Sequence, residues 1–240
     1  MTGDRRAPQL ADLTWPEIAG RPTVAVPLGS VEQHGPHLPL DTDTAIATAV
    51  ARELPDTVTA PAIGYGSSGE HQGFPGTVSI GAEALTAVLL EYGRSIFHWA
   101  GRVVFVNGHG GNLAPLAAAV GRLRAEGRDA GWLPCAVAGA DAHAGHTETA
   151  IMLHLAPDRV HADRLEQGNL AAIETLLPRL RVAGVAAVSA NGVLGDPRSA
   201  GAAAGARLFH EMVAAAAAAV EVWAPRADGL LQVPPVSAPD

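Results

Sequence analysis

The sequence predicts an α/β fold, in which helices connect the strands of a largely parallel sheet. Short apolar runs of strand length alternate with longer segments of helical character, which is typical of βαβ units. The run VVFV at residues 103–106 has no polar alternation, so we expect a central strand covered on both faces. With 240 residues, 48% of them hydrophobic and 17% charged, the chain can bury a substantial core. We therefore expect one domain over residues 1–240.

The expected elements alternate along the chain. The strands are Val24 to Leu28, Val58 to Ile63, Val103 to Val106 and Gly131 to Ala136. The helices are Thr44 to Glu53, Glu83 to Trp99, Asn112 to Glu126, Glu148 to Leu155, Ala162 to Leu180 and Arg198 to Trp223. The tail from Ala227 contains two consecutive prolines and a polar end, so we expect it to be loose.

Composition excludes several classes of function. The net charge is −8 and the arginines are scattered, which argues against a nucleic-acid partner. The one cysteine, Cys135, excludes an internal disulfide framework and a cysteine-rich zinc site, so any metal must bind His, Asp or Glu. The first residues, MTGDRRAPQL, lack an apolar signal region, and the run from Val213 to Val220 is far shorter than the ~20 residues that span a bilayer. We expect a cytoplasmic protein with no membrane partner.

Polar residues gather in the loops that follow the four predicted strands. These loops read GSVEQHGPHLPLDTDT, GYGSSGEHQGFPGT, NGHGGN and AGADAHAGHTET, and each carries at least one histidine. Ligands of parallel sheets bind outside the carboxyl ends of the strands, where such loops meet. The four loops are therefore expected to form one site.

The first loop allows two interpretations. Glu32 and His34 are two residues apart, so in an extended loop both would point the same way, and Asp43 could return to them after a proline-rich bend. A carboxylate and an imidazole from one loop, a bridging carboxylate and a histidine from another loop would suit two metal ions. Alternatively, Asp41 or Asp43 simply caps the helix that begins near Thr44.

The loop NGHGGN also allows two interpretations. It could hold an anion at a helix N-terminus, but it lacks both GxxxxGK[ST] and the complete GxGxxG spacing. Its glycines more plausibly let the backbone turn and leave room around His109. We favour His109 as a metal ligand.

Three separated motifs resemble the creatininase (creatinine amidohydrolase) family of metal-dependent amide hydrolases. They are GSVEQHGPHLPLDTD, NGHGGN and DAHAGHTET, and the resemblance spans roughly residues 20 to 200. GEHQGFPGT and WPEIAGRP look most like the branch that processes the precursor peptide of mycofactocin. The resemblance implies a three-layer α/β/α sandwich with a mostly parallel central sheet. It also implies two divalent ions per subunit, of zinc, iron or manganese, and a homo-oligomer, with hexamers known.

The family pattern implies a set of metal ligands when it is carried over position by position. They are Glu32, His34, Asp43 and His109, with Asp43 the bridge. In creatininase a further acidic ligand follows the third-loop histidine by two residues, and that position is Gly111 here. We expect Glu148 to replace it, either as a ligand or as the proton donor.

Other roles also follow from the resemblance. His143 matches a histidine that lies by the substrate and is suggested to move protons, and with Glu148 it makes the expected catalytic pair. The residue before it is acidic in creatininase and is Ala142 here, which argues against creatinine as the substrate. The expected substrate contacts are Glu70, His71 and His146. We do not expect His37 or Asp41 to be ligands.

The expected chemistry needs no covalent nucleophile. Two divalent ions can polarise a scissile carbonyl and lower the pKa of a bound water towards about 7, and GYGSSG is not a GxSxG elbow. The closer branch implies a peptidase that releases a modified C-terminal Val-Tyr pair from a ribosomal precursor peptide. Two alternatives stay open: a related amidohydrolase acting on a small cyclic amide or formamide, and a non-enzymatic metal- or nucleotide-binding module.

Overall fold

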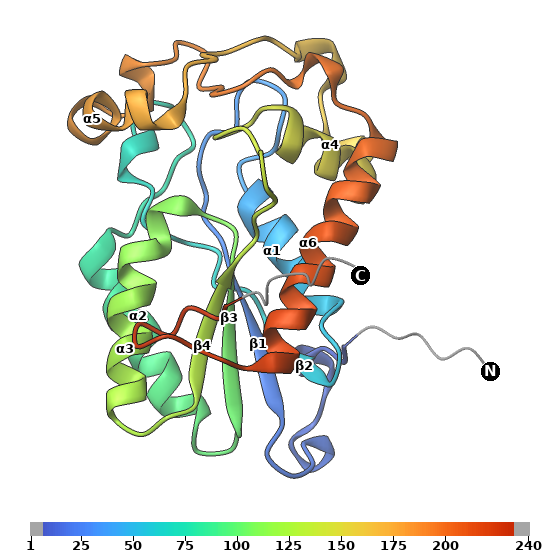
Figure 1. The fold of residues 1–240 in the computed structure, drawn as a ribbon, viewed down its shortest axis with the longest axis vertical. Coiled ribbons are helices and arrows are strands. Elements are labelled where there is room, and N and C mark those ends of the chain that lie inside the picture. Colours follow the sequence, from blue (N-terminus) through green and yellow to red (C-terminus); the bar gives the residue numbers. More distant parts are fainter. Residues whose placement is uncertain (1–6, 233–240) are drawn as a thin grey trace, which may run out of the picture.

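A computed structural model of the chain describes residues 7–232 and contains one four-stranded parallel sheet (Figure 1). The strands are β1 (Thr23–Leu28), β2 (Thr57–Thr59), β3 (Arg102–Asn107) and β4 (Ala130–Pro134). Their order is β2-β1-β3-β4, so the run VVFV lies in an inner strand, as predicted. Because all strands are parallel, every carboxyl end meets at the same edge of the sheet.

Six α-helices accompany the sheet in the described part of the chain. They are α1 (Thr42–Arg52), α2 (Ala82–Ile96), α3 (Leu113–Ala125), α4 (His146–Leu155), α5 (Ile173–Ala183) and α6 (Ala202–Val222). Short 3-10 helices are η1 (Leu10–Asp12), η2 (Trp15–Glu17), η3 (Gly69–His71), η4 (Gly110–Asn112), η5 (Pro157–Arg159), η6 (Ala162–Arg164), η7 (Val185–Ala187) and η8 (Pro197–Ser199). No helix of the described chain is both long enough and apolar enough to cross a membrane.

The helices form one layer on each face of the sheet. Within β3, Val103 and Phe105 pack with α2 and α3, whereas Val104 and Val106 pack with α1, α4 and α6. This alternation follows from the two-residue period of a strand and gives the sheet an apolar core on each side. The predicted three-layer α/β/α sandwich is confirmed, with α2 and α3 on one side and α6 on the other in Figure 1.

Three predicted boundaries are wrong. The helix expected from Ala162 to Leu180 begins only at Ile173, because the preceding segment instead pairs with residues 193–195 through the Gly168 and Asn169 amides. The last helix is interrupted between η8 and α6 at residues 200–201. The strand expected from Val58 to Ile63 ends at Thr59, and Ile63 retains only an isolated bridge to β1.

The tail prediction also needs correction. Residues 227–232 fold back along β4, where the Leu231 amide donates to the Trp132 carbonyl and the Leu231 side chain is buried. The Trp132 indole also donates to the Asp228 carbonyl. Apolar burial and paired backbone groups therefore hold this segment in place. The rest of the predicted loose tail, residues 233–240, lies outside the described residues.

Candidate metal centre

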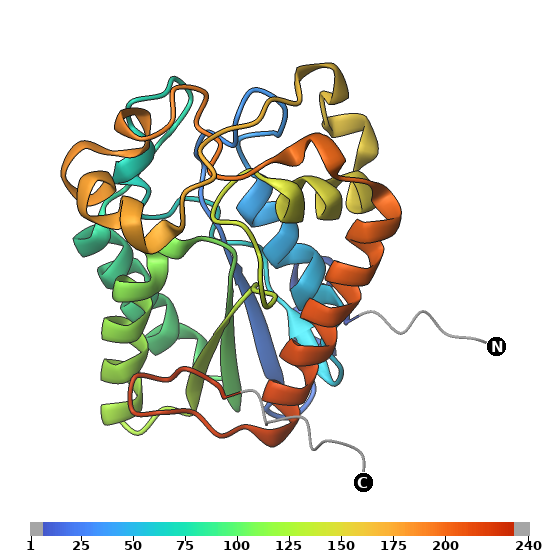
Figure 2. The same cartoon turned by 45° about the horizontal axis from the view of Figure 1, so that its top comes forward.

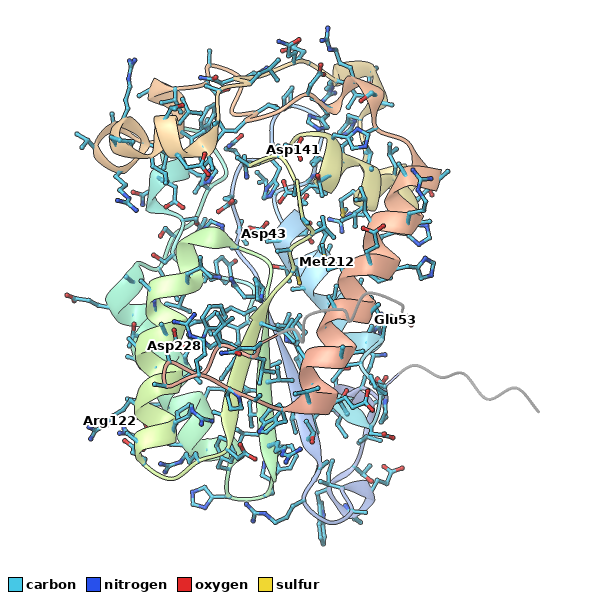
Figure 3. All side chains as sticks on the ribbon, in the orientation of Figure 1. Asp43, Glu53, Arg122, Asp141, Met212 and Asp228 are labelled. Carbon is cyan, nitrogen blue, oxygen red and sulfur yellow. The ribbon has the colours of Figure 1, made fainter. Side chains whose placement is uncertain are left out.

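The loops at the carboxyl ends of the strands gather over one end of the sheet, as Figure 2 shows. Glu32 and His34 lie in the loop after β1, and Asp43 lies in the first turn of α1. His109 follows β3, and Glu148 lies in the first turn of α4. The first four of these side chains are buried. Figure 3 places Asp43 beyond the strand ends, with Asp141 farther out on the same side.

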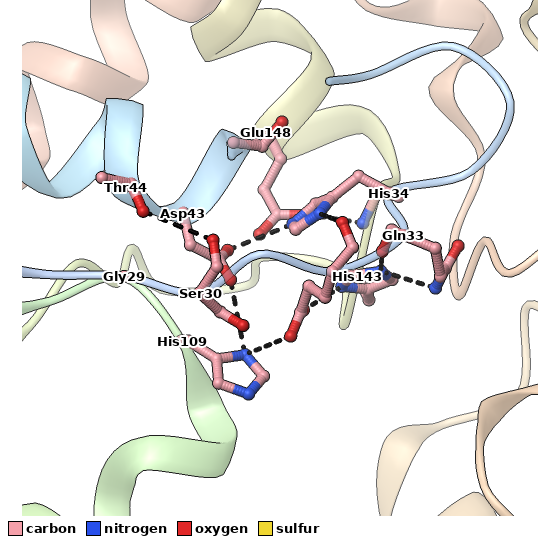
Figure 4. A network of polar contacts seen from close by, with 12 residues as sticks. Gly29, Ser30, Gln33, His34, Asp43, Thr44, His109, His143 and Glu148 are labelled. Atoms are coloured by element: carbon pink, nitrogen blue, oxygen red, sulfur yellow. Dashed lines mark hydrogen bonds and ion pairs between the residues drawn. The ribbon is translucent and has the colours of Figure 1, made fainter. Parts of the chain in front are cut away.

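Asp43 lies between two histidines that come from different loops (Figure 4). Its Oδ1 atom is 3.1 Å from His34 Nε2, and its Oδ2 atom is 3.4 Å from His109 Nδ1. The helix-capping alternative is not supported, because the residue at the N-cap of α1 is Asp41 and its side chain makes no capping hydrogen bond. One carboxylate oxygen for each histidine is the arrangement that a carboxylate bridging two cations needs.

Backbone carbonyls fix which ring nitrogen of each histidine faces this group. His34 Nδ1 lies 3.2 Å from the Glu32 carbonyl, and His109 Nε2 lies 3.1 Å from the Ser67 carbonyl. A carbonyl only accepts, so each of these nitrogens carries a proton. The other nitrogen of each ring faces the carboxylates. This is the outer contact that usually orients a metal-binding histidine.

The carboxylate oxygens have unmet bonding capacity. Both carboxylate oxygens of Glu32 and Oδ2 of Asp43 are buried, and none of them accepts a hydrogen bond from the described residues. Leaving buried anionic oxygens without partners is costly. Glu32 Oε2 lies only 3.1 Å from His109 Nδ1, so Glu32, Asp43 and His109 can offer ligand atoms to one point. Carboxylate oxygen and imidazole nitrogen are ligand atoms that bind zinc, iron and manganese.

The close packing of these ionisable side chains shifts their pKa values when no metal is bound. Burial disfavours protonated His34, but Asp43, Glu148 and Glu32 outweigh it and raise the His34 pKa to about 10. Burial likewise opposes protonation of His109, and Glu32, Asp43 and Glu70 raise its pKa to about 9. Burial and the neighbouring Asp43 charge raise the Glu32 pKa. A bound metal ion would take the place of the protons on His34 and His109 and would balance the charge of the nearby carboxylates.

Glu148 approaches the same group from α4. Its Oε2 atom accepts a 2.6 Å hydrogen bond from the Ala144 amide and lies 3.9 Å from His34 Nε2. Desolvation and the charges of Asp43 and Glu32 raise the Glu148 pKa to about 7, although His34 and the Ala144 amide oppose this. His34, His143 and Glu148 can together offer three ligand atoms to a second point. The structure therefore places Glu148 beside the other predicted ligands.

His143 and His71 are two further buried histidines beside Glu32. His143 Nδ1 is 3.8 Å from Glu32 Oε1, and His71 Nε2 is 3.4 Å from the same atom. Burial, with His34 and His71 nearby, keeps the pKa of His143 well below its usual range. Burial and the nearby His109 and His34 lower the His71 pKa to about 3. Two neutral imidazoles thus face Glu32.

Sequence reasoning missed Gln33. Its buried amide lies between His71 and His143, with Nε2 at 2.9 Å from His71 Nδ1 and 3.0 Å from His143 Nε2. A neutral residue between two predicted ligands carries no metal-binding signal of its own. Its importance becomes visible only when the second and fourth loops meet beside it.

Gly111 has no room for a side chain. A Cβ atom there would lie 2.2 Å from the Ser67 carbonyl oxygen, 2.4 Å from His109 Nε2 and 2.8 Å from Glu70 Oε1. Glu70 itself is 3.5 Å from His109 Nε2. Position 111 therefore has no room for an acidic side chain, because the loop that carries Ser67 and Glu70 fills the space beside it.

The two asparagines of NGHGGN hold the loops together. Asn112 donates to the Gly29 carbonyl at 3.0 Å and accepts from the Ser67 amide at 2.9 Å, while Asn107 donates to the His109 carbonyl at 2.7 Å. These amide groups are occupied by internal contacts, so they are not free to bind phosphate. The two asparagine side chains therefore connect the loops.

The structure does not bring His146 into the group. Its Nδ1 atom contacts Ser199 Oγ at 3.1 Å, and the ring does not line the cavities at the site. His37 contacts Thr149 Oγ1 at 2.8 Å, and Asp41 pairs with Arg159 at 2.5 Å. The predicted substrate contact by His146 therefore has no geometric basis, whereas His37 and Asp41 lie outside the group, as expected.

Two adjoining cavities open onto these residues. The smaller, about 290 Å³, includes Asp43, Cys135 and Glu148 in its lining, and the larger, about 1000 Å³, includes Glu70 and His71. Both reach Glu32, His109 and His143. A substrate can therefore reach these buried histidines and carboxylates from the larger cavity.

Comparison with known proteins agrees with this geometry. The creatininase family model, described as creatinine amidohydrolase, matches residues 11–220. The chain belongs to the creatininase family. It is 59% identical over 219 residues to the mycofactocin precursor peptide peptidase of Mycolicibacterium smegmatis, covering 88% of this chain and 89% of the relative. It is 30% identical over 194 residues to the creatinine amidohydrolase of Pseudomonas putida, covering 65% and 75%.

Solved creatininases share the fold. A structure described as "Creatininase Mn" superposes with a TM-score of 0.75 at 26% identity, covering 91% of this chain and all of that one. A mutant creatininase of "Zn-Zn type" gives a TM-score of 0.75 at 26% identity, with 91% and 99% coverage. The chain is therefore a metal-dependent amide hydrolase of this family, and its buried carboxylates and histidines are suited to hold the metal.

Proposed function

We propose that this protein is a peptidase that releases the modified C-terminal Val-Tyr pair from the mycofactocin precursor peptide. The main support is the 59% identity to a relative with that peptidase name, over most of both chains. The wide cavity beside the metal centre adds a physical argument, since a cavity of about 1000 Å³ is large for a small cyclic amide.

The wall of this cavity suits a peptide with an aromatic end. Helix α5 contributes Ile173, Leu177 and Leu180 to the lining, and Arg181 of the same helix is the one arginine among the lining residues. The end of α5 lies close to the second loop, because a Cβ atom on Gly184 would be 2.7 Å from the Glu70 carbonyl oxygen. An apolar helix face and a metal centre thus border one cleft, in which a peptide can lie across both.

The proposed metal ligands and His143 each have a role in this proposal. Two divalent ions, of zinc, iron or manganese, would be held by Glu32, His34, Asp43, His109 and Glu148. When bound, such ions polarise the amide carbonyl and lower the pKa of a bound water towards about 7. His143 Nδ1 accepts a proton from the attacking water and delivers it to the leaving amine as the C–N bond breaks. The products are a carboxylic acid and the free amino group of the released pair.

The decisive experiment uses the modified precursor peptide and the purified, metal-loaded protein. We expect mass spectrometry to detect the released pair and the shortened peptide. Chelation should stop the release, and added Zn²⁺ or Mn²⁺ should restore it. Hydrolysis of creatinine or a formamide, with the modified peptide left intact under the same conditions, would instead support the small-amide alternative.

A further inference from the structure

The buried amide of Gln33 faces two histidines, and its orientation is fixed by the backbone. The Gly35 amide donates to Gln33 Oε1 at 2.9 Å, and Gln33 Nε2 donates to the Gly192 carbonyl at 3.2 Å. Turning the amide over would set two donors against each other at Gly35 and two acceptors at Gly192. Nε2 therefore points towards His71 and His143.

The proton on His143 is fixed by a neighbouring carbonyl. His143 Nε2 lies 2.8 Å from the Gln33 backbone oxygen, which can only accept, so Nε2 carries the proton. That nitrogen cannot also accept from the Gln33 side chain, although the two atoms are 3.0 Å apart. The unprotonated nitrogen of His143 is then Nδ1, which faces Glu32.

His71 must have the opposite arrangement. The two Gln33 Nε2 hydrogens are left for the Gly192 carbonyl and for His71 Nδ1, which lies at 2.9 Å. His71 Nδ1 is therefore an acceptor, and the proton of the neutral ring is on Nε2. His71 Nε2 lies 3.4 Å from Glu32 Oε1, no hydrogen bond joins the two atoms among the described residues, and the ring lines the larger cavity. His71 differs in this from His34, His109 and His143, in each of which a backbone carbonyl fixes a proton on one nitrogen and leaves the nitrogen that faces the site for a metal ion or a second proton.

We propose that Gln33 holds His71 as a neutral Nε2–H donor, which stabilises the oxyanion formed when water attacks the scissile amide. His71 is then a catalytic residue and not a metal ligand, although its Nε2 lies among possible ligand atoms of Glu32 and His143. Gln33 is a positioning residue. In this role His71 neither gains nor loses its proton: it donates a hydrogen bond that strengthens as negative charge grows on the carbonyl oxygen.

The protonation pattern can be measured without substrate. In the zinc-loaded protein with ¹⁵N-labelled histidine, long-range ¹H–¹⁵N correlation spectra should show His71 protonated at Nε2 and unprotonated at Nδ1. A His71 ring protonated at Nδ1, or with Nε2 bound to zinc, would overturn the proposal. Because no peptide is present, this result is independent of whether the precursor peptide is the substrate.

Substitutions test the role in turnover, which rests on the proposed amide hydrolysis. Loss of one oxyanion donor typically lowers kcat by about 10²–10³-fold. We expect His71→Ala to show this loss with little change in KM and an unchanged zinc content. His71→Gln, whose amide can place an N–H near the former Nε2, should retain more turnover than His71→Asn. Loss of zinc from His71→Ala would identify His71 as a ligand and refute the proposal.

Gln33→Glu tests the positioning directly. A carboxylate can only accept, so it should move the His71 proton to Nδ1 and lower kcat by about 10²-fold while zinc content is kept. Gln72→Glu is a matched control, because it makes the same charge change at an exposed neighbour of His71. An unchanged His71 spectrum in folded Gln33→Glu would refute the role of Gln33. If that variant fails to fold, the wild-type spectrum and the His71 variants still decide.

Discussion

Asp43 Oδ1 lies 3.1 Å from His34 Nε2, although the two residues are separated by a proline-rich bend. The other oxygen, Oδ2, faces His109 and accepts no hydrogen bond among the described residues. A carboxylate that touches both histidines is therefore the residue whose loss should affect the whole centre.

We expect Asp43→Asn to lose most bound metal and to lower turnover by roughly 10³-fold, because metal stabilisation of the transition state contributes several kcal/mol. Metal analysis and peptide turnover would measure both effects. Asp41→Asn makes the same change two residues away, in an exposed pair with Arg159, and should keep metal and activity. Full metal content in Asp43→Asn would show that Asp43 is not the bridge.

Glu148→Gln separates the two roles predicted for this residue. The amide oxygen can still accept from the Ala144 amide, so the local fold should survive. Since Glu148 lies 3.9 Å from His34 Nε2 and shares a possible ion position with it, we expect bound metal to fall from two ions towards one per chain. Glu174→Gln, at an exposed glutamate in the first turn of α5, is the control and should keep both ions. A variant with full metal but little turnover would instead identify Glu148 as the proton donor.

Much of the site was predictable because its residues follow strand ends. Glu32 and His34 lie in one loop, and Asp43 lies in the helix that follows it. His109 follows an apolar strand. Parallel strands bring such positions to one edge by geometry alone. For this reason the hydrophobic pattern and the loop composition together located the candidate ligands.

Other features could not be read from local pattern. The segment before α5 looked helical, but its Gly168 and Asn169 amides bond residues 193–195, a contact between distant parts of the chain. His146 was expected to contact the substrate, yet α4 begins at His146 and its side chain contacts Ser199. Gln33 gains its role from two histidines 38 and 110 residues away. Tertiary contacts decided each of these cases.

Gly111→Ala tests the crowding beside His109. The new Cβ atom would lie 2.4 Å from His109 Nε2 and 2.2 Å from the Ser67 carbonyl oxygen, so it would disturb the hydrogen bond that orients the ring. We expect metal affinity to fall about 10–100-fold, as for other losses of outer contacts to a ligand. Competition with a chelator would measure it. Gly110→Ala is the matched control, since nothing lies within 4 Å of its Cβ position. Equal affinities in the two variants would contradict the packing argument.

Gly205→Ala tests the packing of α6 on α4. A Cβ atom at position 205 would lie 1.8 Å from the Ala150 carbonyl oxygen, so the two helices would have to move apart. We expect the free energy of unfolding to fall by about 1–3 kcal/mol, despite the better helix propensity of alanine. Gly121→Ala, inside α3, meets only ordinary contacts at 3.7 Å and should stabilise the protein by about 0.5–1 kcal/mol. Denaturant unfolding would rank the variants, and a stabilised Gly205→Ala would refute the close approach.

The apolar face of α5 gives a test of how the peptide binds. Leu177 lines the larger cavity, whereas the adjacent Leu176 does not, so the two residues form a matched pair on one helix. Burying most of a leucine side chain against a ligand contributes about 1.5–3 kcal/mol, which corresponds to a roughly tenfold to hundredfold change in binding. We therefore expect Leu177→Ala to raise KM for the modified peptide by about tenfold or more with kcat little changed, because this contact is the same in the ground and transition states. Leu176→Ala should leave KM unchanged. If both variants have the wild-type KM, the peptide does not lie against α5, and its path to the metal centre must lead through the smaller cavity beside Cys135.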